Sequence, residues 1–514
     1  MRIRNESTDD YNDDDLNMDA DDLMIDYPPR SLTAKVLDGF HSLKSSPSEL
    51  WKAYLLKFLD SYSYFSFSII FVLFMSHDFG YTDVEAGLIY GLWGALITVY
   101  GLITGSIVDN LGVAKSLRLG FVLSLIARIG ILLTTSRKIL LLHVCVILPL
   151  GNCMGIPVLT TGIRRYTNES NRGFAFGLFY VIMNVAALLA GPIVDMCTIL
   201  HKDGDEGDDE TQNNSEQTYD GWELTGYRMV VLTGVVANVI AVLVTLTVRE
   251  IKVDTAAPDD GLGRIDSPGR PQRKVSAFTP IQGNYLSILK DTIYTKRFWR
   301  FLVVCMITLN VRMIFRHLDA TWPKYMIREF GENVPKGTIY SINPAFIIIL
   351  VPLVTAATSK IDPLLMIHHG SYVSSLSVFF LVISTSLWSS TAFVVLLSIG
   401  ESIWSPRLYD YTMSVSKEGR EGTYMALSAA PLFLAKLPVG VMSGWLLETY
   451  CPETGTRNSQ MMWLIIGLTT ISSPIFMTVF WKYISYKDLE EVEERNTQYT
   501  ELQGNLQKNK ITDI

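Results

Sequence analysis

The stretch NVRMIFRHLDATWPKY, residues 310–325, places two arginines and an aspartate at the end of the apolar segment FWRFLVVCMITL. In a helix, Arg312 and Arg316 lie one turn apart on the same face, and Asp319 follows Arg316 at the i+3 position, within ion-pair reach. Guanidinium groups placed in this way can bind a carboxylate or another anion through paired hydrogen bonds. Two interpretations stay open: the arginines bind an anionic solute, or Arg316 and Asp319 only pair with each other.

The composition indicates which solvent surrounds these charges. Of 514 residues, 49% are hydrophobic and only 18% are charged, which is typical of a membrane protein with many spans. Apolar runs near the ~20 residues that cross a bilayer recur along the chain. They predict twelve transmembrane helices, at residues 50–75, 83–105, 117–135, 139–162, 172–199, 228–249, 298–320, 337–358, 363–386, 389–411, 422–446 and 461–483. The predicted fold class is an all-α membrane protein.

The order of apolar and polar segments predicts two six-helix bundles. We expect a disordered acidic tail at 1–45, an N-terminal six-helix bundle at 46–249, a Pro- and Gly-rich linker at 250–297, a C-terminal six-helix bundle at 298–485 and a charged tail at 486–514. No signal peptide is recognisable in the acidic first thirty residues. Ser46, Pro47 and Glu49 predict a capping box that starts the first transmembrane helix.

The charges of the loops predict the orientation. The chain from Arg249 to Arg297 carries nine Lys and Arg residues, which places this loop and both termini in the cytoplasm by the positive-inside rule. Asn213 heads a glycosylation sequon on the opposite side, which agrees. The exceptions, cations on that opposite side, are Arg137, Lys138, Lys324, Arg328 and Lys336. The acidic and apolar string DDLMI in the tail resembles a sorting signal, so we expect either the plasma membrane or an endolysosomal membrane.

This topology sets the depth of the opening stretch. Counted from Trp299 at the cytoplasmic face, Arg312 lies about 20 Å along its helix, past the midplane of a ~30 Å hydrocarbon core. Charges at this depth cost at least ~2.5 kcal/mol each unless they face a wet cavity or a partner. We therefore expect Arg312 and Arg316 to face a central cavity. His317 points about 100° away, which favours a structural role.

Other ionisable residues fall inside the predicted helices, namely Asp60, Arg128, Asp195, Glu401, Arg407, Asp410 and Lys436. Lys436 in LFLAKLPVG lies mid-helix, where its ammonium reaches the headgroups with difficulty, so it either pairs with an acid or faces the cavity. Tyr64 and Trp404 are candidates for the cavity lining, although aromatic residues in helices commonly serve packing.

A short loop motif carries a family resemblance. GSIVDNLGVAKS, with Gly105, Asp109, Gly112 and Lys115, is similar to the G-x-L-x-D-x-x-G-x-x-[KR] gating loop of the major facilitator superfamily. Its glycines allow close helix approach, and its aspartate can be held by cations or by a helix N-terminus in one conformation. The alternative is an ordinary tight loop with one solvated aspartate. Asn110 and Val113 stand where basic residues are usual.

Within that superfamily, the chain resembles the proton-coupled oligopeptide transporters. The stretches LDSYSYFSFSIIFVLFM, LGNCMGIPVLT, FYVIMNVAALLAGP and GESIWSP are similar to four family motifs in the same order. The last stretch aligns Glu401 with the intramembrane glutamate of the family. The first-helix E-x-x-E-R triad falls on Lys57, Asp60 and Ser61, and the fourth-helix lysine falls on Ile156. Since those family residues serve proton coupling and carboxylate capture, substrate identity does not carry over.

The predicted function is secondary active transport, coupled to protons, of a small anionic or zwitterionic solute such as a peptide, an amino acid or an organic anion. The candidate substrate-binding residues are Arg312, Arg316, Glu401, Lys436, Asp60, Tyr64 and Trp404, with Glu401 and Asp60 as candidate proton carriers. The alternative is a membrane sensor or scaffold that retains the fold without transporting. The expected partners are the solute, protons and the lipid bilayer, and we expect a monomer. The net charge of −8 comes from two local acidic stretches and identifies no partner; we expect no nucleic-acid partner, and no motif indicates an enzyme, a metal site or a cofactor.

Overall fold

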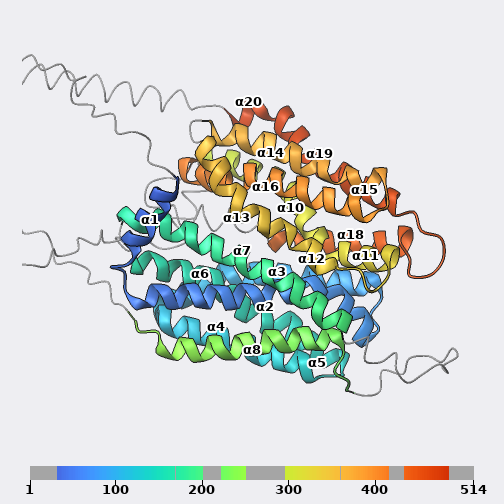
Figure 1. Cartoon of the computed structure of the whole chain (residues 1–514), viewed down its shortest axis with the longest axis horizontal. Helices are drawn as coiled ribbons and strands as arrows, with labels where there is room; N and C mark the ends of the chain where they lie inside the picture. The colour runs from blue at the N-terminus through green and yellow to red at the C-terminus, as the bar shows by residue number, and fades with distance from the viewer. Residues whose placement is uncertain are drawn as a thin grey trace, which may run out of the picture.

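A computed structural model describes residues 32–167, 169–200, 222–250, 296–358, 361–415 and 433–485. Within these residues every regular element is a helix (Figure 1). The first half contains α1 (Leu32–Leu43), α2 (Ser48–Phe79), α3 (Asp83–Leu111), α4 (Val113–Leu133), α5 (Arg137–Leu142), the π-helix η2 (His143–Ile147), α6 (Leu148–Tyr166), α7 (Glu169–Leu200) and α8 (Gly226–Thr247). The second half contains α10 (Lys296–Ala320), α11 (Trp322–Phe330), α12 (Lys336–Tyr340), α13 (Ile342–Ala357), α14 (Pro363–Ser377), α15 (Phe379–Ile383), α16 (Leu387–Val415), α18 (Lys436–Tyr450), α19 (Ser459–Val479) and α20 (Trp481–Ile484).

The predicted membrane fold is confirmed. Eleven helical segments of the described chain are long and apolar enough to cross a bilayer, and they match eleven of the predicted spans. The remaining prediction, 422–446, is described only in its second half, where α18 begins at Lys436. Exposed leucines and isoleucines on these helices are expected where lipid replaces water as the solvent.

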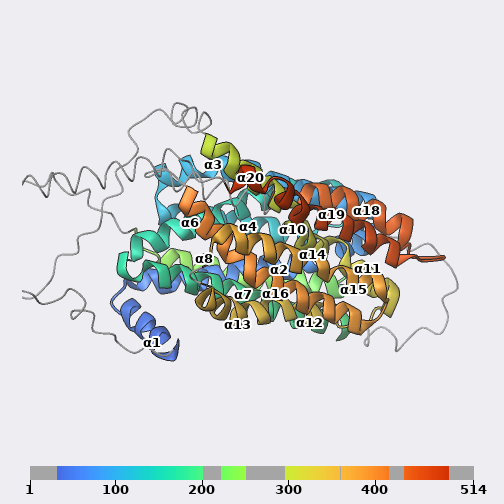
Figure 2. The same ribbon diagram turned by 90° about the horizontal axis from the view of Figure 1, so that it is seen from above.

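The helices form two bundles that lie side by side in Figure 1, and in the view from above the C-terminal helices lie over the N-terminal ones (Figure 2). The N-bundle consists of α2 to α8, in blue to green, and the C-bundle of α10 to α19, in yellow to red. The bundles meet where α18 packs along α3, where α12 and α13 pack on α7, and where α10 and α11 pack on α2. We call the end at which α2 stops and α3 starts the predicted outer end, since the sequence predicts that it lies outside.

Glycines bring α3 and α18 together. A methyl group added to Gly87 or Gly440 would overlap the facing backbone, and one on Gly91 would lie 3.1 Å from the carbonyl oxygen of Leu437. Backbones at this separation require residues without a side chain. The α3–α18 contact therefore joins the N-bundle firmly to the C-bundle.

The N-terminal tail and its junction with α2 differ from the sequence predictions. The tail was predicted to be disordered through residue 45, which is wrong for α1, because Phe40 packs edge-on against Phe174 of α7 at 5.3 Å. The predicted capping box at Ser46 is also wrong: Pro47 itself is the N-cap of α2, in an extended conformation and without a side-chain hydrogen bond.

A reciprocal capping box starts α3 instead. The Thr82 amide donates to Glu85 at 2.9 Å, and the Glu85 amide donates to Thr82 Oγ1 at 3.2 Å.

Within the stretch 310–325, α10 stops at Ala320 and α11 begins with Pro323 in its first turn. The helix is therefore interrupted directly before this proline, whose ring cannot continue a regular helix.

Candidate functional site

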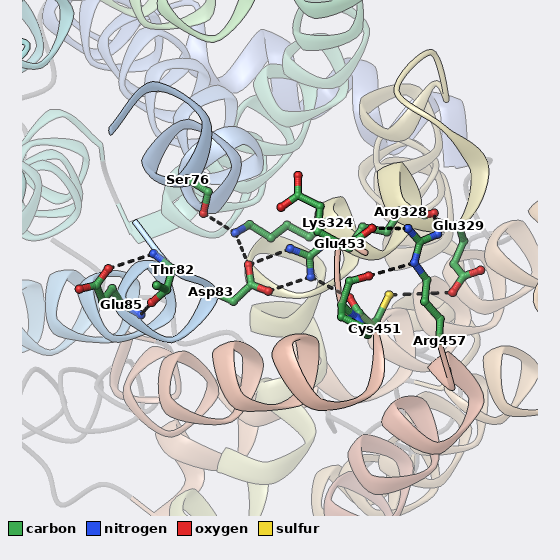
Figure 3. A network of polar contacts seen from close by, with 11 residues as sticks. Ser76, Thr82, Asp83, Glu85, Lys324, Arg328, Glu329, Cys451, Glu453 and Arg457 are labelled. Carbon is green, nitrogen blue, oxygen red and sulfur yellow. Dashed lines mark hydrogen bonds and ion pairs between the residues drawn. The ribbon is translucent and has the colours of Figure 1, made fainter. Parts of the chain in front are cut away.

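Four residues form an ion cluster at the predicted outer end (Figure 3). Asp83, at the start of α3, receives Lys324 Nζ at 2.6 Å and both terminal nitrogens of Arg328 at 2.8 and 2.9 Å. Lys324 also donates to Ser76 Oγ in α2. Burial lowers the pKa of Lys324, and the Asp83 carboxylate opposes that lowering. This outer ion cluster, made of Ser76, Asp83, Lys324 and Arg328, joins α2 and α3 of the N-bundle to α11.

A second contact joins α7 to α12 at the same end. The Asp195 carboxylate accepts hydrogen bonds from the backbone amides of Gly337 at 2.8 Å and Thr338 at 2.6 Å. Lys336 Nζ, next to them in sequence, donates to Thr198 Oγ1 at 3.3 Å. Charge-assisted bonds of this kind are roughly twice as strong as neutral ones. The bundles are therefore closed on each other at the predicted outer end.

These two contacts were missed by sequence reasoning. Lys324, Arg328 and Lys336 were noted only as exceptions to the positive-inside rule. Each of them bonds to a side chain of the N-bundle. Their unexpected position in the sequence was therefore the one feature that could have indicated these contacts. A cation on the side that the rule predicts to be poor in cations favours an acidic partner elsewhere in the fold.

Toward the middle of the bundles, Arg316 and Asp319 form the predicted ion pair, with 3.0 Å between Nη1 and Oδ2. The pair is buried rather than interfacial, since 8% of Arg316 and 1% of Asp319 is exposed. Tyr90 of α3 donates to Asp319 at 2.9 Å, and Tyr340 of α12 donates to it at 3.2 Å. Arg316 also donates to the hydroxyl of Tyr64 in α2. The ion pair thus bridges the two bundles.

Arg312 lies one turn away from Arg316, toward the predicted cytoplasmic side. Its guanidinium is buried and lies 5.3 Å from the ring of Trp404 in α16. Glu401, also on α16, accepts a hydrogen bond from Asn343 Nδ2 of α13 at 2.9 Å. Both arginines act electrostatically on the Glu401 carboxyl. The structure therefore brings together Arg312, Arg316, Glu401 and Trp404, and it adds Tyr64 through its bond to Arg316.

Lys436 occupies an environment that the sequence did not predict. Its ammonium is fully buried and lies 3.5, 4.4 and 4.9 Å from the ring centres of Trp93, Tyr90 and Tyr64. Within the described residues it has no hydrogen-bond partner. Among the described residues no acid forms an ion pair with it, and whether it faces the transport cavity, the other alternative from the sequence, stays a prediction. We call Tyr64, Tyr90 and Trp93 the aromatic cage.

Asp60 lies apart from this group, inside the N-bundle. It lines a small cavity with Ser124, Gly155 and neighbouring residues of α4 and α6. Its charged neighbours are Lys57 and Arg128, both buried. Asp60 therefore faces cations of its own bundle, and its role as a second proton carrier stays a prediction.

The predicted gating loop is described in part. Gly112 has φ +79°, a conformation that favours glycine, and the surroundings of Gly105 and of the Asp109 side chain lie outside the described set. The amides of Val113 and Ala114, which start α4, donate to the Glu250 carboxylate at 3.0 and 2.7 Å. Lys115 is exposed. Asn213, the predicted glycosylation site, lies outside the described residues.

Metal ligation finds no support in the described part of the chain, where no three His, Cys, Asp or Glu side chains cluster. The charged groups of this site can instead bind ions and polar solutes. Two buried arginines that share one helix face with a carboxyl group nearby can bind an anion and exchange a proton.

Comparisons with solved structures show which proteins have a similar fold. The chain superimposes on a POT family transporter in complex with 5-aminolevulinic acid with a TM-score of 0.64, at 15% identity over 86% of this chain and 97% of the other. A POT family transporter in complex with a thioalcohol-conjugated peptide gives 0.65, at 15% identity over the same shares. A nucleoside transporter gives 0.63, at 13% identity over 84% of this chain and 100% of the other.

No curated protein sequence matches the chain significantly. The family model of the Major Facilitator Superfamily matches residues 53–437. This match covers most of the N-bundle and reaches α18 of the C-bundle. The chain is a multi-pass membrane protein with a transporter fold, and it belongs to the Major Facilitator Superfamily.

Proposed function

We propose that the chain is a secondary active transporter that moves a small anionic or zwitterionic solute together with protons by alternating access. The observation that carries this proposal is the position of Arg312 and Arg316 on one face of α10, buried where the two bundles meet. Bundles that rock about a central site expose such a face to each side in turn.

The charge balance favours an anion. Arg312, Arg316, Asp319, Glu401 and Lys436 interact electrostatically, and we call them the central cluster. Among these described residues, three cations against two acids leave a net charge of +1, which becomes +2 when Glu401 takes a proton. An uncompensated charge is costly inside a membrane. A solute with a carboxylate would offset it.

Glu401 suits proton exchange by its surroundings. Its carboxyl is held by a neutral amide, Asn343, and Arg312 and Arg316 act on it electrostatically. A bound solute anion offsets the positive potential of the two arginines. The ionised form of Glu401 is then less stabilised, and its carboxyl binds a proton more readily. Binding and protonation then depend on each other, which is the physical basis of coupling.

The contacts at the predicted outer end support alternating access. The outer ion cluster and the Asp195 contact both link the N-bundle to the C-bundle, and both must break for that end to open. One similar POT family transporter was solved with 5-aminolevulinic acid and another with a thioalcohol-conjugated peptide, and both ligands are compatible with the proposed solute class.

A two-step experiment tests the proposal. Purified full-length protein is first screened by thermal shift with amino acids, dipeptides, carboxylates, nitrate, nucleosides and sugars, because a ligand stabilises the folded state by mass action. The best ligand is then offered to proteoliposomes with an imposed proton gradient. We expect carboxylate-bearing compounds to bind and to accumulate. Binding without accumulation or exchange would favour the sensor alternative, and a response to uncharged compounds alone would contradict the anion site.

A further inference from the structure

Three aromatic rings surround the ammonium of Lys436. Trp93 and Tyr90 come from α3 and Tyr64 from α2, so the whole aromatic cage belongs to the N-bundle. Lys436 is the first residue of α18 in the C-bundle. Its ammonium lies inside the cage. The cage and its occupant are therefore on opposite sides of the bundle interface.

The cage is held in place independently of the lysine. Trp93 stacks on Phe71 with ring centres 5.1 Å apart and planes 2° from parallel. The Tyr90 hydroxyl is fixed by its bond to Asp319, and the Tyr64 hydroxyl accepts from Arg316. Rings fixed in this way lose little further freedom when a ligand enters, which favours binding.

The contacts of Lys436 are those of an ammonium ligand in a binding site. Its ammonium is fully buried, and within the described chain no oxygen or nitrogen accepts a hydrogen bond from it. The ring faces supply the attraction, and aromatic cages recognise ammonium groups of small ligands in this way. A lysine kept only for packing could be replaced by an apolar side chain at lower desolvation cost.

Opening of the predicted outer end must empty the cage. The α3–α18 contact lies between the cage and that end, so separation of these helices withdraws Lys436 and leaves the three rings without a cation, with Trp93 still stacked on Phe71 of its own bundle. We propose that the aromatic cage is the subsite for a primary ammonium group of the solute, and that Lys436 is its tethered occupant in the closed conformation.

This inference rests on the proposed function and narrows its solute class. A carboxylate would lie against Arg312 and Arg316, and an ammonium group would enter the cage, so the solute carries both charges. Return of Lys436 to the cage would expel that ammonium as the outer end closes. The released group then leaves toward the other side.

Chemical rescue tests the cage without knowledge of the solute. In Lys436→Ala the cage loses its cation, and propylammonium matches most of the missing side chain. We expect propylammonium to raise the melting temperature of the full-length Lys436→Ala protein in a saturable way. Wild type should respond far more weakly, because the tethered ammonium of Lys436 competes with propylammonium for the cage. The response should vanish in Lys436→Ala/Trp93→Leu.

Two controls fix the interpretation. Leu437→Ala removes the neighbouring side chain, which is 41% exposed, and it should respond to propylammonium as wild type does. Propan-1-ol has the same shape as propylammonium without the charge. Equal stabilisation of Lys436→Ala by the alcohol would overturn the inference, because the cage would then be an apolar hole only. A rescue that persists without Trp93 would overturn it as well.

A second measurement uses the unaltered lysine, in case Lys436→Ala does not fold. Binding of 5-aminopentanoate and of pentanoate is compared by thermal shift, with glycine to 6-aminohexanoate and the matching alkanoates covering other lengths. We expect the best amino acid to bind about tenfold more tightly than its alkanoate partner. Trp93→Leu should reduce that ratio to near one without changing alkanoate binding. Equal binding of both series in wild type would overturn the cage as an ammonium subsite.

The two proposals fail in different ways. If the anion site is wrong, alkanoate binding will not depend on Arg312, while the propylammonium rescue of Lys436→Ala remains. If the cage is wrong, the rescue fails, while loss of alkanoate binding in Arg312→Ala remains.

Discussion

Asp83 of α3 and Arg328 of α11 lie 245 residues apart in sequence and form an ion pair with two hydrogen bonds, of 2.8 and 2.9 Å. The same Asp83 carboxylate binds Lys324, and the side chains of all three residues are nearly buried. A guanidinium that donates two hydrogen bonds in this way holds a carboxylate in one orientation. One aspartate therefore carries much of the contact between the bundles at the predicted outer end.

Asp83→Asn should open the predicted outer end. Removal of one partner leaves the two cations buried without their charge partner, which costs the closed conformation about 3–5 kcal/mol. Distances between spin labels on the outer ends of α3 and α11, measured by pulsed electron paramagnetic resonance, should shift to a longer population.

Glu85→Gln is the matched control for that prediction. Glu85 lies two residues along α3, and its hydrogen bonds stay within its own helix start at Thr82. It should leave the label distances unchanged. If Asp83→Asn behaves like Glu85→Gln, the outer ion cluster does not hold the bundles together.

Arg312→Ala should weaken binding of carboxylate ligands by roughly 2–5 kcal/mol, because the anion of the ligand then lacks its buried partner. Arg312→Lys should recover only part of this, since an ammonium cannot form the bidentate fork. Ligand titrations by thermal shift measure both effects. Arg137→Ala is the control, because that arginine binds the carbonyl oxygens of Phe79 and Gly80, away from the central cluster. Unchanged affinity in a folded Arg312→Ala protein contradicts the anion site.

Arg316 should be more important for stability than Arg312. Its partner Asp319 is 1% exposed, so Arg316→Gln leaves a buried carboxylate without its cation and costs about 3–5 kcal/mol. The double variant Arg316→Gln/Asp319→Asn should cost less than the sum of the two single variants. Melting temperatures of the four proteins in one detergent provide this cycle. Additive losses would show that the two side chains act independently.

The predictable part of the fold came from hydropathy, because lipid imposes one length and one polarity on every spanning helix. The pair Arg316–Asp319 was predictable because both residues are on one helix, so their spacing fixes their distance. The pairing of Asp83 with Lys324 joins helices from different bundles, and no local pattern determines such a partner. The cage around Lys436 was unpredictable for the same reason, and aromatic residues are too common in membrane helices to mark it.

The orientation that the sequence predicts has its own test at Asn213. In a glycosylating host, glycosidase treatment should shift the wild-type band and leave Asn213→Gln unchanged, since only a sequon outside the cytoplasm is modified. Protease protection that places the loop after α7 on the cytoplasmic side would reverse the assignment of the two ends.

Glu401→Gln tests proton-coupled transport, the central claim, most directly. Glutamine keeps an oxygen that can accept the hydrogen bond from Asn343, but it can neither bind nor release a proton. The measurement compares uptake driven by a pH gradient with exchange between preloaded proteoliposomes and the medium, for wild type and Glu401→Gln. The account predicts that the variant loses gradient-driven uptake and retains exchange. Accumulation by the variant against a solute gradient, under an imposed proton gradient, would contradict Glu401 as the proton carrier.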